Sequence, residues 1–131
     1  MIVIDACVWI EALQKTSTGV RYKTLWNRPE EIIVPTAVQF EIYRWCLKNM
    51  DEDFAVNAIS GTRRCVVQPA NEKIALLAAS IASPLRLAAL DALVYATAMV
   101  LKARVVTCDA HFEGLPLADY QPKLSHSATR P

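Results

Sequence analysis

The sequence predicts an α/β fold, a single three-layer α/β/α sandwich around a mostly parallel sheet of four or five strands. Two observations support this prediction. Short apolar runs recur without alternating with polar residues, as in strands that are covered on both faces. Helical patterns fill the segments between these runs, and strands that alternate with helices form parallel βαβ units. The 131 residues, 53% of them hydrophobic, suffice for one domain with a substantial core.

Four of the apolar runs are expected to be strands, and a weaker fifth strand can form near Leu117. The four are Ile2-Val3-Ile4, Ile32-Ile33-Val34, Cys65-Val66-Val67 and Arg104-Val105-Val106-Thr107. Helical patterns run from Val8 through about Leu13 toward Trp26, then over residues 37–49, 52–59, 71–82 and 87–102. A short turn of helix is expected after Asp109. Thr36 is the expected N-cap of the second helix, and Pro84 ends the helix over residues 71–82.

Composition and charge favour a cytoplasmic protein. The net charge of +1 indicates neither a strongly basic surface nor an acidic tail, although a local basic patch is compatible with it. The four cysteines are widely spaced and form no C-x-x-C motif, which favours reduced thiols over disulfides or zinc. Because Asp5 interrupts the first apolar run, we expect no signal peptide, and no uncharged stretch is long enough to span a membrane. We expect residues 1–124 to form the domain and residues 125–131 to form a flexible tail.

Four acidic residues occupy positions that packing would otherwise give to apolar side chains. Asp5 follows the first apolar run, and Asp109 follows the last one in a similar way. Glu41 lies on the apolar stripe of the second helix, and Asp91 lies within the apolar face of the last long helix. The other acids are in loops, at helix starts or, like Glu11, at expected surface positions, where acidic side chains are ordinary. The four exceptions are therefore candidates for a functional site.

The predicted topology brings these four acids toward one place. In a parallel sheet the carboxyl ends of the strands share one edge, where ligands bind. Asp5 and Asp109 should meet there, and Glu41 and Asp91 can lean over that edge from neighbouring helices. Carboxylates held this close repel one another unless a cation neutralises them, and an all-oxygen ligand set favours Mg²⁺ or Mn²⁺ over zinc. The competing interpretation is that the four acids are separately satisfied caps and buried hydrogen-bonding groups.

Four segments carry a resemblance to a known family: MIVIDACVWIE, PTAVQFEIYRW, LDALVYATA and VVTCDAHF. In this order and spacing, from Met1 to about Leu117, they resemble the PIN-domain ribonucleases, in particular the VapC-like toxins of type II toxin–antitoxin modules. The resemblance implies a PIN-like α/β/α fold and an acidic quartet formed by Asp5, Glu41, Asp91 and Asp109. It also implies a cytoplasmic homodimer that is bound and blocked by a small cognate antitoxin protein.

The resemblance extends to residues near the quartet. Thr107 matches the hydroxyl residue that precedes the last acid of the family by two positions, and Phe112 matches the aromatic residue that follows that acid. Cys7 departs from the family, which has a small polar residue two positions after the first acid, so Cys7 is not assigned to the site. Trp9 can be a core residue or stack a base, and the first is the more common use of such a residue.

The implied activity is Mg²⁺- or Mn²⁺-dependent endonucleolytic hydrolysis of RNA phosphodiester bonds. Asp5 and either Asp91 or Asp109 are the expected direct metal ligands, and Glu41 would bind directly or through water. The supporting basic residues near the expected edge are Arg44, Lys48 and Arg86, whose ordinary interpretation is solvated helix surface. His111 is interpreted as a surface residue beside the site.

Two other classes compete with a nuclease. The first is a catalytically inactive PIN-like module that binds RNA or protein. The second is an aspartate-based phosphotransfer protein, which also begins with an apolar strand that ends in aspartate. Phosphatases of that type have a second acid two residues later, where this chain has Cys7, and receiver proteins have an aspartate after the third strand, where this chain has Gln68-Pro69. The phosphotransfer class is therefore the least favoured.

Overall fold

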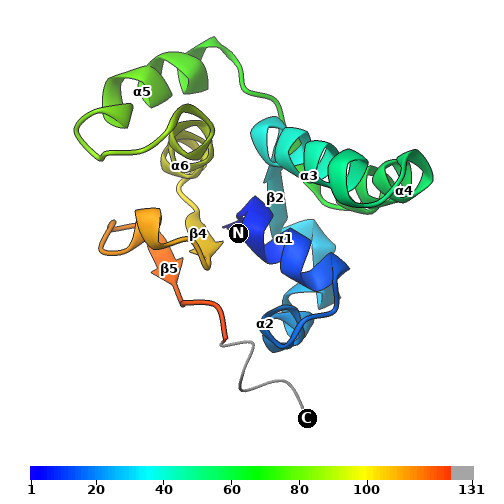
Figure 1. Ribbon diagram of the computed structural model, residues 1–131. Coiled ribbons are helices and arrows are strands. Elements are labelled where there is room, and N and C mark those ends of the chain that lie inside the picture. The colour runs from blue at the N-terminus through cyan, green and yellow to red at the C-terminus, as the bar shows by residue number, and fades with distance from the viewer. Residues whose placement is uncertain (125–131) are drawn as a thin grey trace.

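Five parallel strands form the centre of the protein, as a computed structural model that describes residues 1–124 shows (Figure 1). The spatial order is β3-β2-β1-β4-β5, and every neighbouring pair is parallel. The bounds are β1 Ile2–Ile4, β2 Ile32–Pro35, β3 Val66–Gln68, β4 Arg104–Thr107 and β5 Ala118–Tyr120. The predicted parallel α/β fold is confirmed, with the weak fifth strand present. The predicted tail, residues 125–131, lies outside the described residues.

Helices cover both faces of this sheet. The α-helices are α1 Ala6–Leu13, α2 Ser17–Arg21, α3 Thr36–Asn49, α4 Glu52–Thr62, α5 Glu72–Ala82 and α6 Ala89–Leu101. Three short 3-10 turns join them, η1 Lys23–Asn27, η2 Pro29–Glu31 and η3 Ala110–Phe112. Helices α1 to α4 gather on one side of the strands, and α5 and α6 lie on the other (Figure 1). Right-handed βαβ crossovers produce this division, because the chain moves first from β1 toward β3 and then back to β4.

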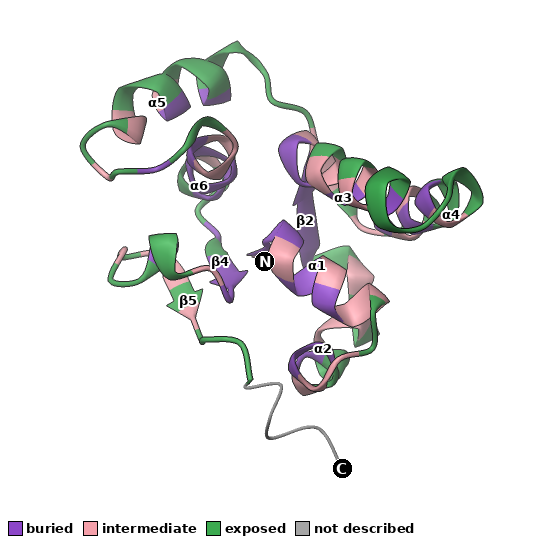
Figure 2. Cartoon of the chain, in the orientation of Figure 1, coloured by how far each residue is buried: buried purple, intermediate pink, exposed green. Residues whose placement is uncertain are grey.

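The core lies between the helices and the sheet. The side chains of β1, β2 and β4 that face the helices are buried, and so are the inner faces of α3 and α6 (Figure 2). Trp9 belongs to this core, with 8% of its surface exposed, and its ring packs against Trp26. This position favours the packing interpretation of Trp9 over base stacking. Among the described residues, no helix is long and apolar enough to cross a membrane.

Three local expectations about the helices are wrong. The helical pattern that runs toward Trp26 does not form one helix. The chain turns at Lys15, which has a φ of 57°, so α1 ends before it and the short helix α2 begins separately at Ser17. Thr36 is the first residue of α3 rather than its N-cap, and its hydroxyl instead accepts a hydrogen bond from Ala70 N–H at 3.1 Å. Glu11 is buried rather than on the surface, because α2 packs over it and the Thr16 hydroxyl donates a hydrogen bond to its carboxylate at 2.9 Å.

The topology defines where a ligand would bind. From β1 the chain turns toward β2 and β3, and then returns to β4 on the other side of β1. The switch point therefore lies between the carboxyl ends of β1 and β4, which is where ligands bind in open α/β sheets. Asp5 directly follows β1, and Asp109 lies two residues after β4.

Candidate active site

Asp5 is the most deeply buried acid of the candidate site, with 3% of its surface exposed. It follows β1 and begins α1, and its Oδ1 accepts a hydrogen bond from Ala6 N–H at 2.8 Å. Its Oδ2 accepts a hydrogen bond from the Thr107 hydroxyl at 2.8 Å. Burial raises the pKa of Asp5, and the hydrogen bonds from Thr107, Cys7 and Ala6 partly offset this effect. Asp5 is thus held in one orientation at the switch point.

Thr107 and Cys7 connect the ends of β1 and β4 around this carboxylate. The Thr107 hydroxyl donates to Asp5 and accepts a hydrogen bond from Asp109 N–H at 3.0 Å, so it positions the first and the last acid together. The Cys7 thiol donates to Asp5 Oδ2 at 3.4 Å and accepts a hydrogen bond from Cys108 N–H at 3.3 Å. Cys7 therefore occupies the polar position beside Asp5, although it was not assigned to the site from the sequence.

Glu41 reaches the same place from the second turn of α3, which follows β2. Its carboxylate is partly buried, and its Oε1 is fully enclosed without a hydrogen-bond partner among the described residues. Burial, together with the negative charges of Asp5 and Asp91, raises the pKa of Glu41 to about 7, although the nearby Arg44 guanidinium acts in the opposite direction. A buried carboxylate oxygen without a partner is costly, which indicates that a cationic or hydrogen-bonding group is missing there.

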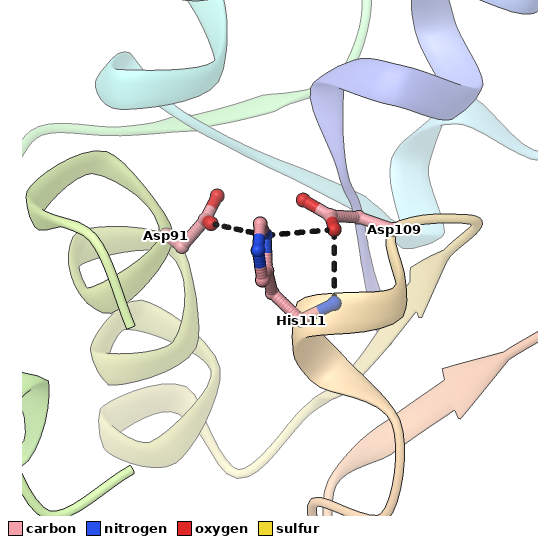
Figure 3. Close-up of side chains that lie close together, drawn as sticks. All are labelled: Asp91, Asp109 and His111. Carbon is pink, nitrogen blue, oxygen red and sulfur yellow. Dashed lines mark hydrogen bonds and ion pairs between the residues drawn. The ribbon is translucent and has the colours of Figure 1, made fainter. Parts of the chain in front are cut away.

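Asp91 and Asp109 face each other with His111 between them (Figure 3). Asp91 lies in the first turn of α6, where the helix dipole favours a negative charge. Burial and the negative charges of Asp5 and Asp109 nevertheless combine to raise the pKa of Asp91 to about 6. Asp109 Oδ1 accepts a hydrogen bond from His111 N–H at 2.9 Å, which starts the η3 turn.

The four predicted acids therefore converge, although they come from four separate segments of the chain. Carboxylate oxygens of Asp5, Glu41 and Asp91 lie within 4.8 Å of one another. Asp91, Asp109 and the His111 imidazole form a second group, whose ligand atoms also lie within 4.8 Å of one another. Asp91 therefore belongs to both groups. The mutual repulsion, the raised pKa values and the unpartnered Glu41 Oε1 all fit a divalent cation with oxygen ligands.

The predicted basic residues are distributed unevenly around the acids. Arg44 and Lys48 project from α3 and line a depression of about 600 Å³ together with Glu41, Trp45, Asn49 and Ile10. The Arg44 guanidinium also stacks over the Phe40 ring, at 5.1 Å from its centroid. Arg86 lies in the exposed loop between α5 and α6 with φ 56°, and none of the ion pairs within residues 1–124 joins it to the acids. Two of the three basic residues are thus next to the acidic site.

Sequence reasoning missed the parts that Cys7 and His111 play in the site. Both lie two residues after an acid of the quartet, and in both cases a tight turn brings that second side chain back toward the carboxylate. The acid-x-residue spacing was the available signal. The resemblance used such a two-residue spacing for Thr107, which precedes Asp109, and for Cys7, which was set aside as a departure from the family; it was not applied to His111.

These features define a class: a parallel α/β/α protein that gathers four carboxylates at its topological switch point. The PIN domain family model matches residues 2–116, and the chain belongs to the PIN-domain family. The predicted resemblance is confirmed in this respect. None of the curated proteins compared with the chain matches it significantly by sequence.

Solved structures, toxin–antitoxin proteins among them, have the same fold. VapC20 from Mycobacterium tuberculosis, a toxin that cleaves the sarcin–ricin loop, superposes with a TM-score of 0.76 and 15% identity over 93% of this chain and 100% of that one. A toxin–antitoxin complex from Klebsiella pneumoniae superposes with a TM-score of 0.74 and 17% identity, over 90% of this chain and 95% of that one. FitAcB from Neisseria gonorrhoeae superposes with a TM-score of 0.71 and 19% identity, over 93% of this chain and 98% of that one. The chain therefore has the fold of VapC-type toxins along nearly their whole length.

Proposed function

We propose that this protein is a metal-dependent endoribonuclease of the cytoplasm that hydrolyses RNA phosphodiester bonds, and that it is the toxin of a toxin–antitoxin pair. The observation that supports this proposal most strongly is the convergence of Asp5, Glu41, Asp91 and Asp109 at the switch point of a PIN-domain fold. The fold shared with VapC20, a toxin that cleaves the sarcin–ricin loop, supports RNA as the substrate class.

The residues present fit Mg²⁺ or Mn²⁺. Asp5, Glu41 and Asp91 form an all-oxygen group, and the enclosed Glu41 Oε1, which has no hydrogen-bond partner within residues 1–124, is the atom that most needs a cation. Asp109 adjoins this group through Asp91. A divalent cation bound here supplies activation of the attacking water and charge stabilisation at the leaving oxygen.

The protein's own residues hold the reactants in place. The Thr107 hydroxyl and the Cys7 thiol fix Asp5, so the first carboxylate needs little reorganisation when substrate arrives. Arg44 and Lys48, on the α3 surface next to Glu41, contact phosphates of the RNA backbone and set its register over the acids. Trp9 takes no part in substrate binding, because it is buried against Trp26.

Asp5→Asn tests the activity, because it keeps the shape of the side chain and removes its charge. We expect RNA cleavage in vitro to fall by at least about 100-fold, since a direct ligand of the cation is neutralised. Growth inhibition on expression of the chain alone should be relieved. Asp53→Asn, a change of the same type at an exposed position of α4, is the matched control and should cleave RNA and slow growth like the wild type.

Two outcomes of this experiment would contradict the proposal. Equal toxicity of Asp5→Asn and wild type at equal soluble levels would remove Asp5 from the site. A wild-type protein that binds Mn²⁺ and RNA without cutting the RNA would instead place the chain among the catalytically inactive PIN-like modules.

We also propose that the partner is a small antitoxin protein that lays an apolar segment on α3. Phe40, Tyr43 and Leu47 line an apolar groove there, with Arg44 and Lys48 at its sides. Phe40 and Leu47 are 45% and 49% exposed, which is unusual for large apolar side chains on one helix face. Because Glu41 and Arg44 lie on the same helix, an occupant of this groove would also obstruct the acids.

Homodimerisation is proposed on family grounds, and a separate surface is available for it. Leu76 on α5 is 63% exposed, and Met99 and Leu101 on α6 are each 37% exposed. Because α5 and α6 lie across the sheet from most of α3 and α4, a dimer formed there leaves the α3 groove accessible (Figure 1). Light scattering of the purified chain measures its mass in solution directly.

A further inference from the structure

His111 is placed between two acids of the site by the backbone of the η3 turn. Its N–H donates to Asp109 Oδ1 at 2.9 Å, which fixes the main chain, and its imidazole then lies between Asp91 and Asp109 (Figure 3). The imidazole Nδ1 is 3.1 Å from Asp109 Oδ1 and 3.9 Å from Asp91 Oδ2. The side chain is 71% exposed, so no packing against the core holds it in this position.

These separations are those expected of three ligands of one ion. Neighbouring ligands of a cation bound at about 2.1 Å lie about 3 Å apart, and they lie farther apart when the angle between them opens. The Nδ1 of His111 and the carboxylate oxygens of Asp91 and Asp109 all lie within 4.8 Å of one another. Few rearrangements are therefore needed for one cation to contact all three side chains.

The two ligand groups that share Asp91 differ in chemistry. Asp5, Glu41 and Asp91 offer oxygen alone, which suits Mg²⁺. Asp91, Asp109 and His111 add an aromatic nitrogen, and imidazole nitrogen binds Mn²⁺ and the later transition metals better than it binds Mg²⁺.

We propose that His111 is a metal ligand, and that with Asp91 and Asp109 it forms a position selective for a divalent transition-metal ion, with Mn²⁺ preferred over Mg²⁺. This inference rests on the metal-dependent activity proposed above and adds the identity of one ligand and of the preferred ion. In the absence of the ion the same imidazole lies at ion-pair distance from both carboxylates, 3.1 Å from Asp109 and 3.9 Å from Asp91, which accounts for its place in the structure.

Calorimetric titration of the purified chain with MnCl₂ and with MgCl₂ tests the selectivity. We expect His111→Ala to weaken Mn²⁺ binding by about 10-fold or more and Mg²⁺ binding by less than about 3-fold, because the nitrogen ligand favours only the transition metal. The chain contains two histidines, so His126→Ala is the matched control and should leave both affinities unchanged. Circular dichroism confirms that the variants are folded.

Pulsed electron paramagnetic resonance of bound Mn²⁺ provides a readout that does not depend on affinity. The wild type and His126→Ala should show modulation from a directly coordinated imidazole ¹⁴N, and His111→Ala should lack it. Absence of this modulation from the wild type would overturn the inference. Equal weakening of Mn²⁺ and Mg²⁺ in His111→Ala would also overturn it, because His111 would then only position the carboxylates.

The outcomes separate this inference from the proposed function. If His111→Ala keeps its Mn²⁺ affinity while Asp5→Asn loses RNA cleavage, His111 is not a ligand and the nuclease proposal stands. If the wild type binds Mn²⁺ through His111 but does not cut RNA, the ligand assignment stands and the nuclease proposal fails. If the wild type binds neither ion, both are wrong.

Discussion

At the scale of the residue, Asp91 experiences two opposing electrostatic effects. The dipole of α6 stabilises a negative charge in its first turn by about 0.3–1 kcal/mol, whereas burial and the charges of Asp5 and Asp109 disfavour that charge. The second effect is the larger, because the pKa of Asp91 is raised to about 6. An uncharged side chain of the same shape should therefore suit the metal-free protein.

Asp91→Asn tests this balance through stability. In EDTA at pH 7.5 we expect the variant to melt at or above the wild-type temperature, by an amount on the order of 1 kcal/mol or less once solvent screening is included. Adding Mg²⁺ or Mn²⁺ should stabilise the wild type by mass action and the variant much less. Melting curves in both buffers measure this, and a variant that is markedly less stable in EDTA would make Asp91 a structural acid.

Glu41 gives the metal-free protein a specific pH dependence. Its pKa is raised from 4.5 to about 7, so the folded state binds a proton more tightly than the unfolded chain does. The resulting contribution to stability is complete below pH 4.5 and is lost as the pH rises through about 7. In EDTA the wild type should therefore melt several degrees higher at pH 6 than at pH 8, with a contribution on the order of 1 kcal/mol after screening.

Glu41→Gln separates this effect from other titrations. The variant should lose most of the difference in melting temperature between pH 6 and pH 8, whereas Glu52→Gln, at an exposed position of α4, should retain it. A pH dependence that is the same in wild type and Glu41→Gln would show that Glu41 is not strained by its neighbours.

At the scale of the element, the close contact between α1 and α2 depends on Gly19. A Cβ built at this position would lie 2.3 Å from the carbonyl oxygen of Glu11 and 2.8 Å from the Ala12 Cα. Those atoms belong to the backbone of α1, so they cannot move without displacing one helix from the other. Glycine is required here by proximity and not by its own dihedral angles.

Gly19→Ala should therefore destabilise the protein by about 2 kcal/mol or more through overpacking. Gly61→Ala is a matched control within α4, since a Cβ there meets nothing within 4 Å, and it should be neutral or stabilising by up to about 1 kcal/mol. Urea denaturation of the two variants measures the difference. Similar stabilities for both would mean that α2 can shift away from α1 at little cost.

The elements also show what the sequence could predict. Apolar runs without alternation located four of the strands. In β1, β2 and β4 the reason is that strands buried on both faces cannot tolerate polar side chains, whereas β3 lies at the sheet edge and is only partly buried. Lys15 could not be identified as a helix break, because its left-handed conformation is imposed by packing of α2 on α1 rather than by a residue that favours it. Glu11 was taken for a surface acid for the same reason, since the helix that buries it follows later in the chain.

At the scale of the whole molecule, the acids could be predicted while their surroundings could not. Glu41 and Asp91 stood out because each interrupts an apolar helix face. The contacts of Cys7 and His111 depend on side-chain directions in tight turns, and sequence spacing alone does not determine those directions. The topology was sufficient to locate the site, but not to complete its list of residues.

The proposed antitoxin surface can be tested on the whole molecule. The chain should co-purify with a small protein encoded beside it, and RNA cleavage should be inhibited in that complex. Leu47→Asp, in the exposed α3 groove, should weaken this binding by about 2 kcal/mol or more and leave cleavage by the free chain intact. Val20→Asp on α2 is the matched control, because Val20 is similarly exposed, at 52%. A neighbouring protein that neither binds nor inhibits would remove the toxin assignment and leave the nuclease assignment.

The central position of β1 has a consequence for the newly synthesised chain. Residues 2–4 leave the ribosome about 100 residues ahead of β4, which begins only at Arg104, yet β1 is flanked by β2 and β4. Until β4 has emerged, the middle strand has one open edge and Asp5 lacks the Thr107 hydroxyl that orients it. Contacts this distant along the chain also make folding slow. The acidic site is thus among the last parts of the molecule to assemble, and a translation product that ends before Asp109 cannot contain it.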